Sequence, residues 1–176
     1  LNALAGYVKS NTGSIFINGD DYYRNFDAYR TLIGYVPQDD IIHRTLPVER
    51  ALSYAAQLRL PNDTAPSEIK QRIERVLEDV EMTMHRDKLV ENLSGGQRKR
   101  VSIGAELLAD PSLFFLDEPT SGLDPGLEKK MMYTLRRLAD SGRTVVLVTH
   151  ATANITQCDH VVFMSDGRMV YFGPPS

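Results

Sequence analysis

Apolar residues recur at helical spacing in two segments near the middle of the chain, residues 48–60 and 67–82. The apolar stripe of the first segment consists of Val48, Ala51, Leu52 and Ala55. The stripe of the second consists of Ile69, Ile73, Leu77 and Val80. This spacing predicts an amphipathic α-helix in each segment. Ser67 is the expected N-cap of the second helix, because its hydroxyl can accept a free N–H group at a helix start.

Short unbroken apolar runs, a different pattern, flank this helical region. They lie within residues 13–19, 32–38, 113–119, 144–150 and 160–167. Between and before them we expect a helix after residue 94, another at 126–139, and a helix end at 1–8 that closes near Gly6. Buried strands that alternate with helices predict an α/β fold, with a parallel sheet covered on both faces. Residues 39–92 are predicted to be an all-helical insertion.

Composition indicates an ordinary globular protein. The 176 residues suffice for one domain with its own core, and 42% hydrophobic with 24% charged residues is typical of soluble proteins. A net charge of −3 gives no electrostatic reason to expect nucleic acid as a partner. The basic run at 98–100 is interpreted as the solvated face of a helix. Cys158, the single cysteine, is interpreted as a small buried hydrophobe in a reducing cytosol.

Two predicted strands end in polar side chains that suit phosphoryl transfer. Asp117 and Glu118 follow one apolar run, and His150 follows another. Ligands of parallel sheets bind beyond the carboxyl ends of the strands, where phosphoryl transfer requires an acid for Mg²⁺ and a group that activates water. Asp117 would hold Mg²⁺, directly or through water, and Glu118 would act as general base. Two turn-forming acids at a strand end are the alternative interpretation.

Three polar residues each have a functional and a structural interpretation. Gln38 follows a predicted strand, so its amide could reach Mg²⁺ or the attacking water, or could simply be solvated. His150 could donate a hydrogen bond to a phosphate oxygen, or could be structural. Asp124 ends the stretch "SGLD" and could be the N-cap of a helix that begins with Pro125.

The stretch "LSGGQRKR" at 93–100 places two glycines ahead of a predicted helix. A Gly-Gly pair lets the backbone approach another group closely. A helix start offers free N–H groups and about half a positive charge, which suit phosphate. The usual phosphate loop, G-x-x-x-x-G-K-[ST], appears nowhere in the chain. The sequence therefore predicts a turn that contacts a phosphate held elsewhere.

These motifs, in this order, resemble the ATP-binding cassette (ABC) ATPase family over essentially all of the chain. The resemblance equates Gln38, "LSGGQ", "LFFLDEP", "SGLD" and His150 with the family's Q-loop, signature motif, Walker B strand, D-loop and switch histidine. It implies a P-loop NTPase-like (RecA-like) core at 1–38 and 93–176, a helical subdomain at about 39–92, and ATP and Mg²⁺ as ligands. The implied site residues are catalytic Glu118 and His150, nucleotide-binding Gln38, Ser94, Gly95, Gly96, Gln97 and Asp124, and metal-binding Asp117 and Gln38.

In that family two cassettes pair head to tail, and the signature turn of one contacts the γ-phosphate bound to the other. The resemblance therefore implies a second ABC ATPase domain as a partner. The chain departs from the family pattern because the phosphate loop, its lysine and the aromatic residue that stacks on adenine are missing. We expect a piece of a longer protein that carries them, and no appreciable ATP hydrolysis by these 176 residues alone.

Longer stretches such as "SGGQRKRVSIGAELL" and "VYFGPPS" resemble the G-type (white-like) ABC transporters and their bacterial relatives. Those proteins join the cassette to a membrane domain, usually as exporters of lipids, sterols or other amphiphiles. This implies a transmembrane permease domain that contacts residues around 39–60, and a location on the cytoplasmic face of a membrane. The alternatives are a non-transport cassette of DNA repair or translation, and a non-catalytic partner cassette. The compact, non-basic insertion disfavours the first, and the presence of Glu118 and His150 disfavours the second.

Overall fold

A parallel sheet lies at the centre of the protein, in a computed structural model that describes residues 1–39 and 41–175. Residue 40, at the start of the predicted helical insertion, lies outside this description. The sheet has three strands in the order β3-β4-β5. They are β3 (Ile33–Val36), β4 (Leu113–Asp117) and β5 (Thr144–Val148). Each falls within one of the short apolar runs, so these strand predictions are confirmed.

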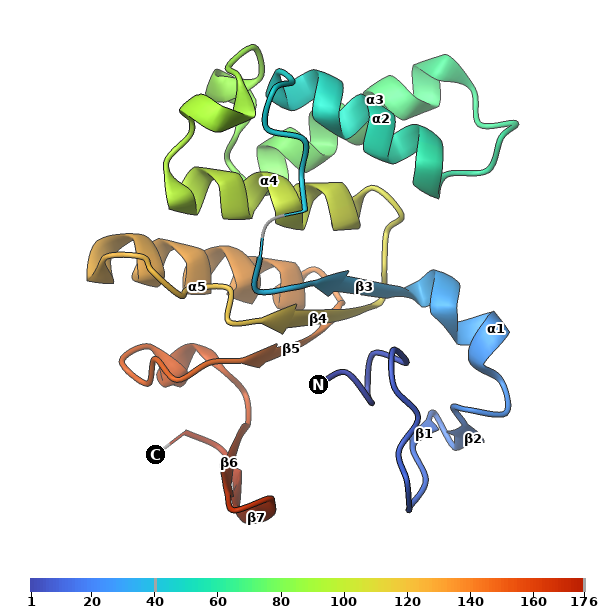
Figure 1. Ribbon diagram of the computed structural model, residues 1–176, viewed down its shortest axis with the longest axis vertical. Helices are drawn as coiled ribbons and strands as arrows, with labels where there is room; N and C mark the ends of the chain where they lie inside the picture. The colour runs from blue at the N-terminus through green and yellow to red at the C-terminus, as the bar shows by residue number, and fades with distance from the viewer. Residues whose placement is uncertain (40, 176) are drawn as a thin grey trace.

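Helices cover one face of this sheet in two layers (Figure 1). The inner layer consists of α4 (Gly95–Leu107) and α5 (Pro125–Asp140). The outer layer consists of α2 (Val48–Arg59) and α3 (Pro66–Asp79), which pack against α4. The predicted helices are confirmed, and their apolar stripes point inward because helical spacing places those residues on one side. Gly104 permits the close crossing, since a Cβ there would lie 2.9 Å from Val76 Cγ1.

The hydrophobic core lies between the helices and this face of the sheet. The strands contribute Val36, Phe114 and Leu116, which alternate with residues that point to the other face. The helices contribute fully buried side chains, among them Leu52, Leu77, Val101 and Met131. The apolar positions that define each predicted element are therefore the ones that bury its surface.

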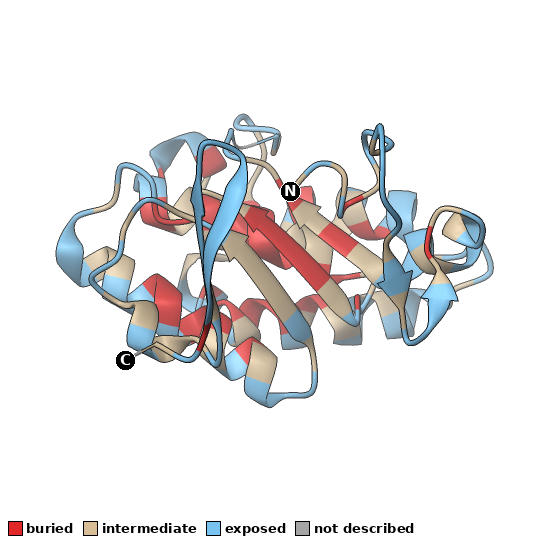
Figure 2. Cartoon of the chain, turned by 90° about the horizontal axis from the view of Figure 1, so that it is seen from below, coloured by how far each residue is buried: buried red, intermediate tan, exposed pale blue. Residues whose placement is uncertain are grey.

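The other face of the sheet is covered less completely than predicted. Residues 1–8 pass beneath it, and the rings of Tyr7 and Tyr35 lie 4.8 Å apart. The predicted helix end is a single turn, in which the Ala5 N–H donates to Leu1 O at 2.9 Å and Gly6 follows with φ +81°. Every residue of β5 remains at least partly exposed, so this face still has apolar surface available (Figure 2).

Two small antiparallel hairpins stand apart from the parallel sheet. One pairs β1 (Phe16–Ile17) with β2 (Asp20–Asp21). The other pairs β6 (Val161–Ser165) with β7 (Arg168–Gly173), and it is exposed over most of its length (Figure 2). The run at 160–167 was predicted to be a strand of the alternating parallel pattern, and the structure differs because this strand pairs with the segment that follows it.

Short helical segments join these parts. They are α1 (Phe26–Tyr29) and the 3₁₀ turns η1 (Arg30–Leu32), η2 (Thr83–His85), η3 (Val90–Asn92) and η4 (Ile155–Gln157). Among the described residues, no helix combines the length and apolar character that a membrane crossing requires.

Of the two N-cap residues predicted from the sequence, the structure confirms one. Asp124 caps α5, with Oδ1 accepting the N–H groups of Gly126 at 3.0 Å and Leu127 at 3.1 Å. The prediction that Ser67 caps α3 is wrong. The helix begins one residue earlier at Pro66, whose fixed φ suits the first helical position, and Ala65 occupies the N-cap.

Candidate functional site

The carboxyl ends of the three parallel strands meet at one edge of the sheet. The pairing is in register, with Val36 opposite Leu116 and Leu116 opposite Leu147. Gln38, Glu118 and His150 each follow the end of one strand, so the sheet delivers all of them to the same edge. The N–H of Glu118 donates to Val148 O at 2.9 Å and ties the end of β4 to that of β5.

Glu118 and His150 form a close pair at this edge. Nδ1 of His150 lies 2.9 Å from Oε2 of Glu118. The Glu118 side chain is 17% exposed, whereas the His150 side chain is 76% exposed. Although the two atoms are within ion-pair distance, their alignment is not that of a hydrogen bond, and Oε2 is buried without a directed donor. A carboxylate beside an imidazole at the end of a parallel strand has the chemistry of a proton acceptor.

The backbone of Glu118 adopts a conformation that L-residues avoid. Its φ is +48°, in the left-handed region where a Cβ normally costs about 1–2 kcal/mol. Strain of this kind often occurs at functional sites, since the surrounding structure must hold the residue in place. Here the strand pairing of Asp117 and the hydrogen bond to Val148 fix the backbone on either side of the turn. The turn aims the Glu118 side chain towards His150.

Asp117 is the last residue of β4 and lies on the face opposite the helices, as alternation with Leu116 requires. The Tyr35 hydroxyl lies 3.4 Å from Asp117 Oδ2 and 3.0 Å from Asn2 Oδ1. Burial, followed by the charge of Asp117, raises the pKa of Tyr35, so this hydroxyl stays neutral as a donor. One long hydrogen bond leaves most of the Asp117 lone pairs available.

The side chains at this edge suit a Mg²⁺ ion that is bound partly by the protein and partly by the phosphates of a bound substrate. Among the described residues, no group of three or more His, Cys, Asp or Glu side chains could enclose a metal ion. Mg²⁺ in phosphoryl-transfer sites is commonly bound through one or two carboxylates, water and substrate phosphates rather than by a protein cage. Asp117 and the exposed amide of Gln38 fit that pattern.

The turn at residues 94–97, called the signature turn below, is shaped by a capping box at the start of α4. Ser94 Oγ accepts the Gln97 N–H at 3.3 Å, and Gln97 Oε1 accepts the Ser94 N–H at 3.0 Å. The N–H groups of Gly95 and Gly96 have no carbonyl one turn earlier, as at any helix start. A Cβ at Gly95 would meet no atom within 4 Å, so this backbone faces open space. The turn is therefore accessible at Ser94 and Gly95, whereas Gly96 is buried against Leu123.

The signature turn also contacts the segment before it. Gln97 Nε2 lies 3.0 Å from Nε2 of His85, which belongs to η2. The hydrogen bonds and ion pairs of the described residues do not join the signature turn to Glu118 or His150. The predicted site residues therefore form two groups, one at the sheet edge and one at the start of α4.

Lys99 connects the two groups, and the sequence interpretation missed it. Its side chain is buried, with 6% exposed, and Nζ donates to the carbonyls of Pro37 at 3.2 Å and Gln38 at 2.6 Å. The prediction of a solvated basic face at 98–100 is wrong. Arg98 is half-buried and donates to Leu93 O at 2.5 Å, and Arg100 pairs with Glu81 at 3.1 Å. Lys99 and Arg100 reach acceptors from distant parts of the chain, whereas Arg98 donates to a carbonyl five residues earlier.

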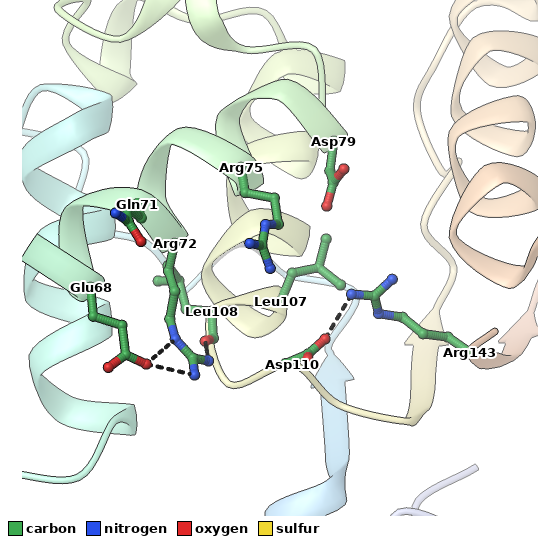
Figure 3. Close-up of a pocket in the computed structure, with 9 residues that line it drawn as sticks. All are labelled: Glu68, Gln71, Arg72, Arg75, Asp79, Leu107, Leu108, Asp110 and Arg143. Atoms are coloured by element: carbon green, nitrogen blue, oxygen red, sulfur yellow. Dashed lines mark hydrogen bonds and ion pairs between the residues drawn. The ribbon is translucent and has the colours of Figure 1, made fainter. Parts of the chain in front are cut away.

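A pocket of about 270 Å³ lies away from both groups, between α3 and the end of α4 (Figure 3). Its lining residues are Glu68, Gln71, Arg72, Arg75, Asp79, Leu107, Leu108, Asp110 and Arg143. Arg72 donates to Leu108 O at 3.2 Å, and Arg143 pairs with Asp110 at 2.8 Å. The first contact joins α3 to the end of α4, the second joins two loops, and neither includes a predicted site residue. The candidate site is an open edge and an open turn rather than this pocket.

Comparison with known proteins places this arrangement in a family. A family model described as "ABC transporter" matches residues 1–121. The chain is 47% identical over 174 residues to the ABC transporter ATP-binding/permease protein Rv1747 of Mycobacterium tuberculosis. It is 39% identical over 184 residues to ABC transporter G family member 28 of Arabidopsis thaliana. These matches cover 98% and 99% of this chain but 20% and 16% of those proteins, so the chain spans about a fifth of their length or less.

A solved structure agrees with the sequence matches. The structure described as cbiO1 from Clostridium perfringens, part of the ABC transporter complex cbiONQ, superposes with a TM-score of 0.85 and 30% identity. The match covers 98% of this chain and 70% of that one. The chain belongs to the ABC transporter family, with the fold of its ATPase domain and a resemblance to G family members. This confirms the resemblance and the α/β fold class inferred from the sequence.

Proposed function

We propose that this chain provides most of the ATP-hydrolysing machinery of a transporter, and that it acts as one half of a head-to-tail pair of ABC ATPase domains. The observation that carries the proposal is the pair of Glu118 and His150 at the edge where the sheet also places Asp117 and Gln38. These residues offer a proton acceptor, a donor to phosphate, a carboxylate and an amide. Phosphoryl transfer requires these groups, held in place before the reaction.

Glu118 is proposed as the general base. Its carboxylate would orient the attacking water and take its proton, and the positive φ at this position directs the side chain towards His150 at the sheet edge. His150, mostly exposed and next to Glu118, would donate a hydrogen bond to a γ-phosphate oxygen. Asp117 and Gln38 would hold Mg²⁺, which when bound neutralises charge on the phosphate oxygens.

The signature turn is proposed to contact the nucleotide of the partner domain. Ser94, Gly95 and Gly96 form a helix start at which Ser94 and Gly95 are exposed, and Gln97 holds the turn through the capping box. An anion is stabilised there by the N–H groups and the helix dipole. We place Asp124 at the same pair interface, because it lies on an exposed turn that follows the catalytic strand.

A phosphate loop from outside these 176 residues completes the proposed site. The chain contains no G-x-x-x-x-G-K-[ST] motif, and half a unit of helix charge does not replace the lysine and the successive N–H groups of that loop. We therefore expect no appreciable ATP hydrolysis by the 176 residues alone. Within a complete transporter, the loop would approach the Asp117 face of the sheet, where the described chain leaves surface exposed.

A groove between α2 and α3 is the proposed contact surface for a permease domain. It encloses about 490 Å³ and is lined on the α2 side by Pro47, Glu49, Arg50, Ser53 and Gln57. Arg86 fixes the walls, since its guanidinium bonds Glu49 at 3.0 Å and Glu74 at 2.5 Å. A helix of the membrane domain that docks in this groove would be displaced when α2 moves relative to the sheet. This arrangement would couple ATP-driven pairing to export, at the cytoplasmic face of a membrane.

The test uses the complete transporter, reconstituted in vesicles, with Glu118→Gln and with His150→Ala. We expect Glu118→Gln to lower ATP turnover at least about 100-fold while it retains ATP binding, because the amide keeps the shape of the side chain but cannot take a proton. A Glu118→Gln variant with wild-type turnover would refute the assignment. Arg72→Gln, which alters the pocket of Figure 3, is the matched control and should hydrolyse ATP normally.

A further inference from the structure

Lys99 forms a hydrogen-bonded link between the signature helix α4 and the segment that carries Gln38. It belongs to α4, five positions after Ser94, and its ammonium group lies against two consecutive backbone carbonyls. A lysine that is 94% buried is uncommon, and its charge must be compensated by acceptors at the buried end. The carbonyls of Pro37 and Gln38 are two of the acceptors that face it.

We propose that Lys99 is a positioning residue that couples the two nucleotide sites of the paired domains. This inference rests on the function proposed above. The signature turn would contact the partner's nucleotide, whereas Gln38 would contact the Mg²⁺ and water of the nucleotide bound to its own chain. Lys99 belongs to the same rigid helix as the first group and bonds to the backbone of the second. When the signature turn engages a phosphate, the resulting displacement of α4 is passed to the carbonyls at 37 and 38.

The geometry favours transmission in this direction. Lys99 holds the main chain of Gln38 and leaves its exposed side-chain amide free to reach a ligand. The other end of the link is stiff, because the capping box and the contact between Gln97 and His85 hold the first turn of α4. Pro37 restricts the backbone beside the anchor point. The segment is thus held by the sheet at Val36 and by α4 at residues 37 and 38, and the second attachment moves with α4.

The coupling differs from a simple packing role in what it predicts for kinetics. Loss of the link should leave each nucleotide able to bind, since no proposed ligand is removed. It should weaken the dependence of one site on the other, which appears as reduced cooperativity and as a lower kcat with little change in KM. Coupling free energies in proteins typically correspond to factors of about 5–150.

The experiment compares Lys99→Met, Lys99→Arg and Arg100→Met in the complete transporter. Arg100 is the matched control because it lies next to Lys99 on α4 and pairs with Glu81 rather than with the Gln38 segment. We expect Lys99→Met to lower kcat by about tenfold, to bring the Hill coefficient for ATP close to 1, and to change KM less than about twofold. Lys99→Arg should recover most of kcat and of the Hill coefficient, since a guanidinium can also donate to two carbonyls. Arg100→Met should leave the Hill coefficient unchanged.

A second readout does not depend on turnover. Hydrogen exchange of the peptide that contains Gln38 should slow when ATP is added to a Glu118→Gln background, and this protection should disappear with Lys99→Met. If Lys99→Met does not fold, Lys99→Gln replaces it, because a neutral amide fits a buried site more easily but is too short to bridge both carbonyls. An unchanged Hill coefficient together with unchanged protection would overturn the proposal. Failure of the proposed function would look different, since the wild type itself would then show no turnover that Glu118→Gln removes.

Discussion

Nδ1 of His150 lies 2.9 Å from Oε2 of Glu118, and the Glu118 backbone is held at φ +48° beside it. The two residues follow neighbouring parallel strands, and the sheet brings them together without any local sequence signal that they should meet. The strain at Glu118 is the part of this relationship that can be measured apart from catalysis, because it contributes to folding as well as to function.

Replacement of Glu118 should reveal that strain as an inverted order of stability. Glycine adopts positive φ without steric cost, whereas alanine retains a Cβ. We expect Glu118→Gly to be more stable than Glu118→Ala by about 1 kcal/mol, although glycine is normally the less favourable residue. Chemical denaturation of the two purified variants measures the difference. An alanine variant of equal or greater stability would mean that the backbone relaxes to negative φ once the carboxylate is gone.

Two glycines of α4 should separate function from folding. A valine at Gly95 would project into open space, so we expect the free energy of unfolding to change by less than about 0.5 kcal/mol while ATP turnover of the complete transporter is lost. A valine at Gly104 would collide with Val76 and should destabilise the protein by about 1–3 kcal/mol. Thermal unfolding and turnover of both variants check this. If Gly95→Val hydrolysed ATP normally, the proposed phosphate contact would be wrong.

Asp124 offers a direct choice between its two interpretations. Asp124→Ala removes the cap of α5 and should cost about 1 kcal/mol, whereas Asp124→Ser keeps an acceptor for the same N–H groups and should be nearly neutral. If Asp124 also acts at the interface of the paired domains, Asp124→Ser restores stability but not turnover. Full recovery of both by serine would leave Asp124 as a helix cap alone. Denaturation and ATPase assays on the two variants give the answer.

The contribution of Glu106 to the free energy of unfolding should decrease as pH rises. This side chain of α4 pairs with Arg59. Burial raises the pKa of Glu106, whereas Arg59 and the Tyr35 N–H lower it. Burial is the larger effect, so the pKa lies above the ordinary value of 4.5. Between 4.5 and the raised value the folded state binds more protons than the unfolded state. The free energy of unfolding therefore decreases as pH rises through that window and is level above it.

Glu106→Gln should remove this component, so the wild type should lose stability relative to the variant between pH 4.5 and its folded pKa. Urea denaturation of both proteins at several pH values measures the difference. A wild type that gains on the variant as pH rises would show that the ion pair with Arg59 outweighs the burial of the carboxylate. The sign of the slope thus distinguishes the two effects without an absolute pKa.

Periodicity predicted the elements of this fold because each of them buries its own apolar stripe. The helices at 48–59 and 125–140 and all three parallel strands were predictable for that reason, and so was the cap at Asp124, whose donors lie within three residues. Long-range contacts were not predictable in this way. Lys99 belongs to a basic run that is typical of a solvated helix face, and only the packing of α4 beneath residues 37 and 38 makes it buried.

The candidate site likewise has features that the sequence predicts and features that it does not. Residue types and their order along the chain were sufficient to propose Gln38, Asp117, Glu118 and His150, since parallel strands place their carboxyl ends at one edge. The positive φ of Glu118 could not be foreseen, because no glycine or asparagine marks the position. The contact between Gln97 and His85 was missed for another reason, since η2 has no periodic pattern that would orient its side chains.

The in-register pairing of β3, β4 and β5 has a consequence for how faithfully the protein must fold. Residues of β4 alternate between the helix-covered face, which receives Leu116, and the opposite face, which receives Asp117. A slip of β4 by one position against its neighbours would exchange these two side chains and bury a carboxylate among the helices. The hydrophobic contacts that disfavour such a misfolded sheet therefore also align the proposed catalytic edge. Variants with less specific strand pairing should lose activity because a fraction of the molecules pairs the strands out of register. The site residues themselves would be unchanged in every molecule.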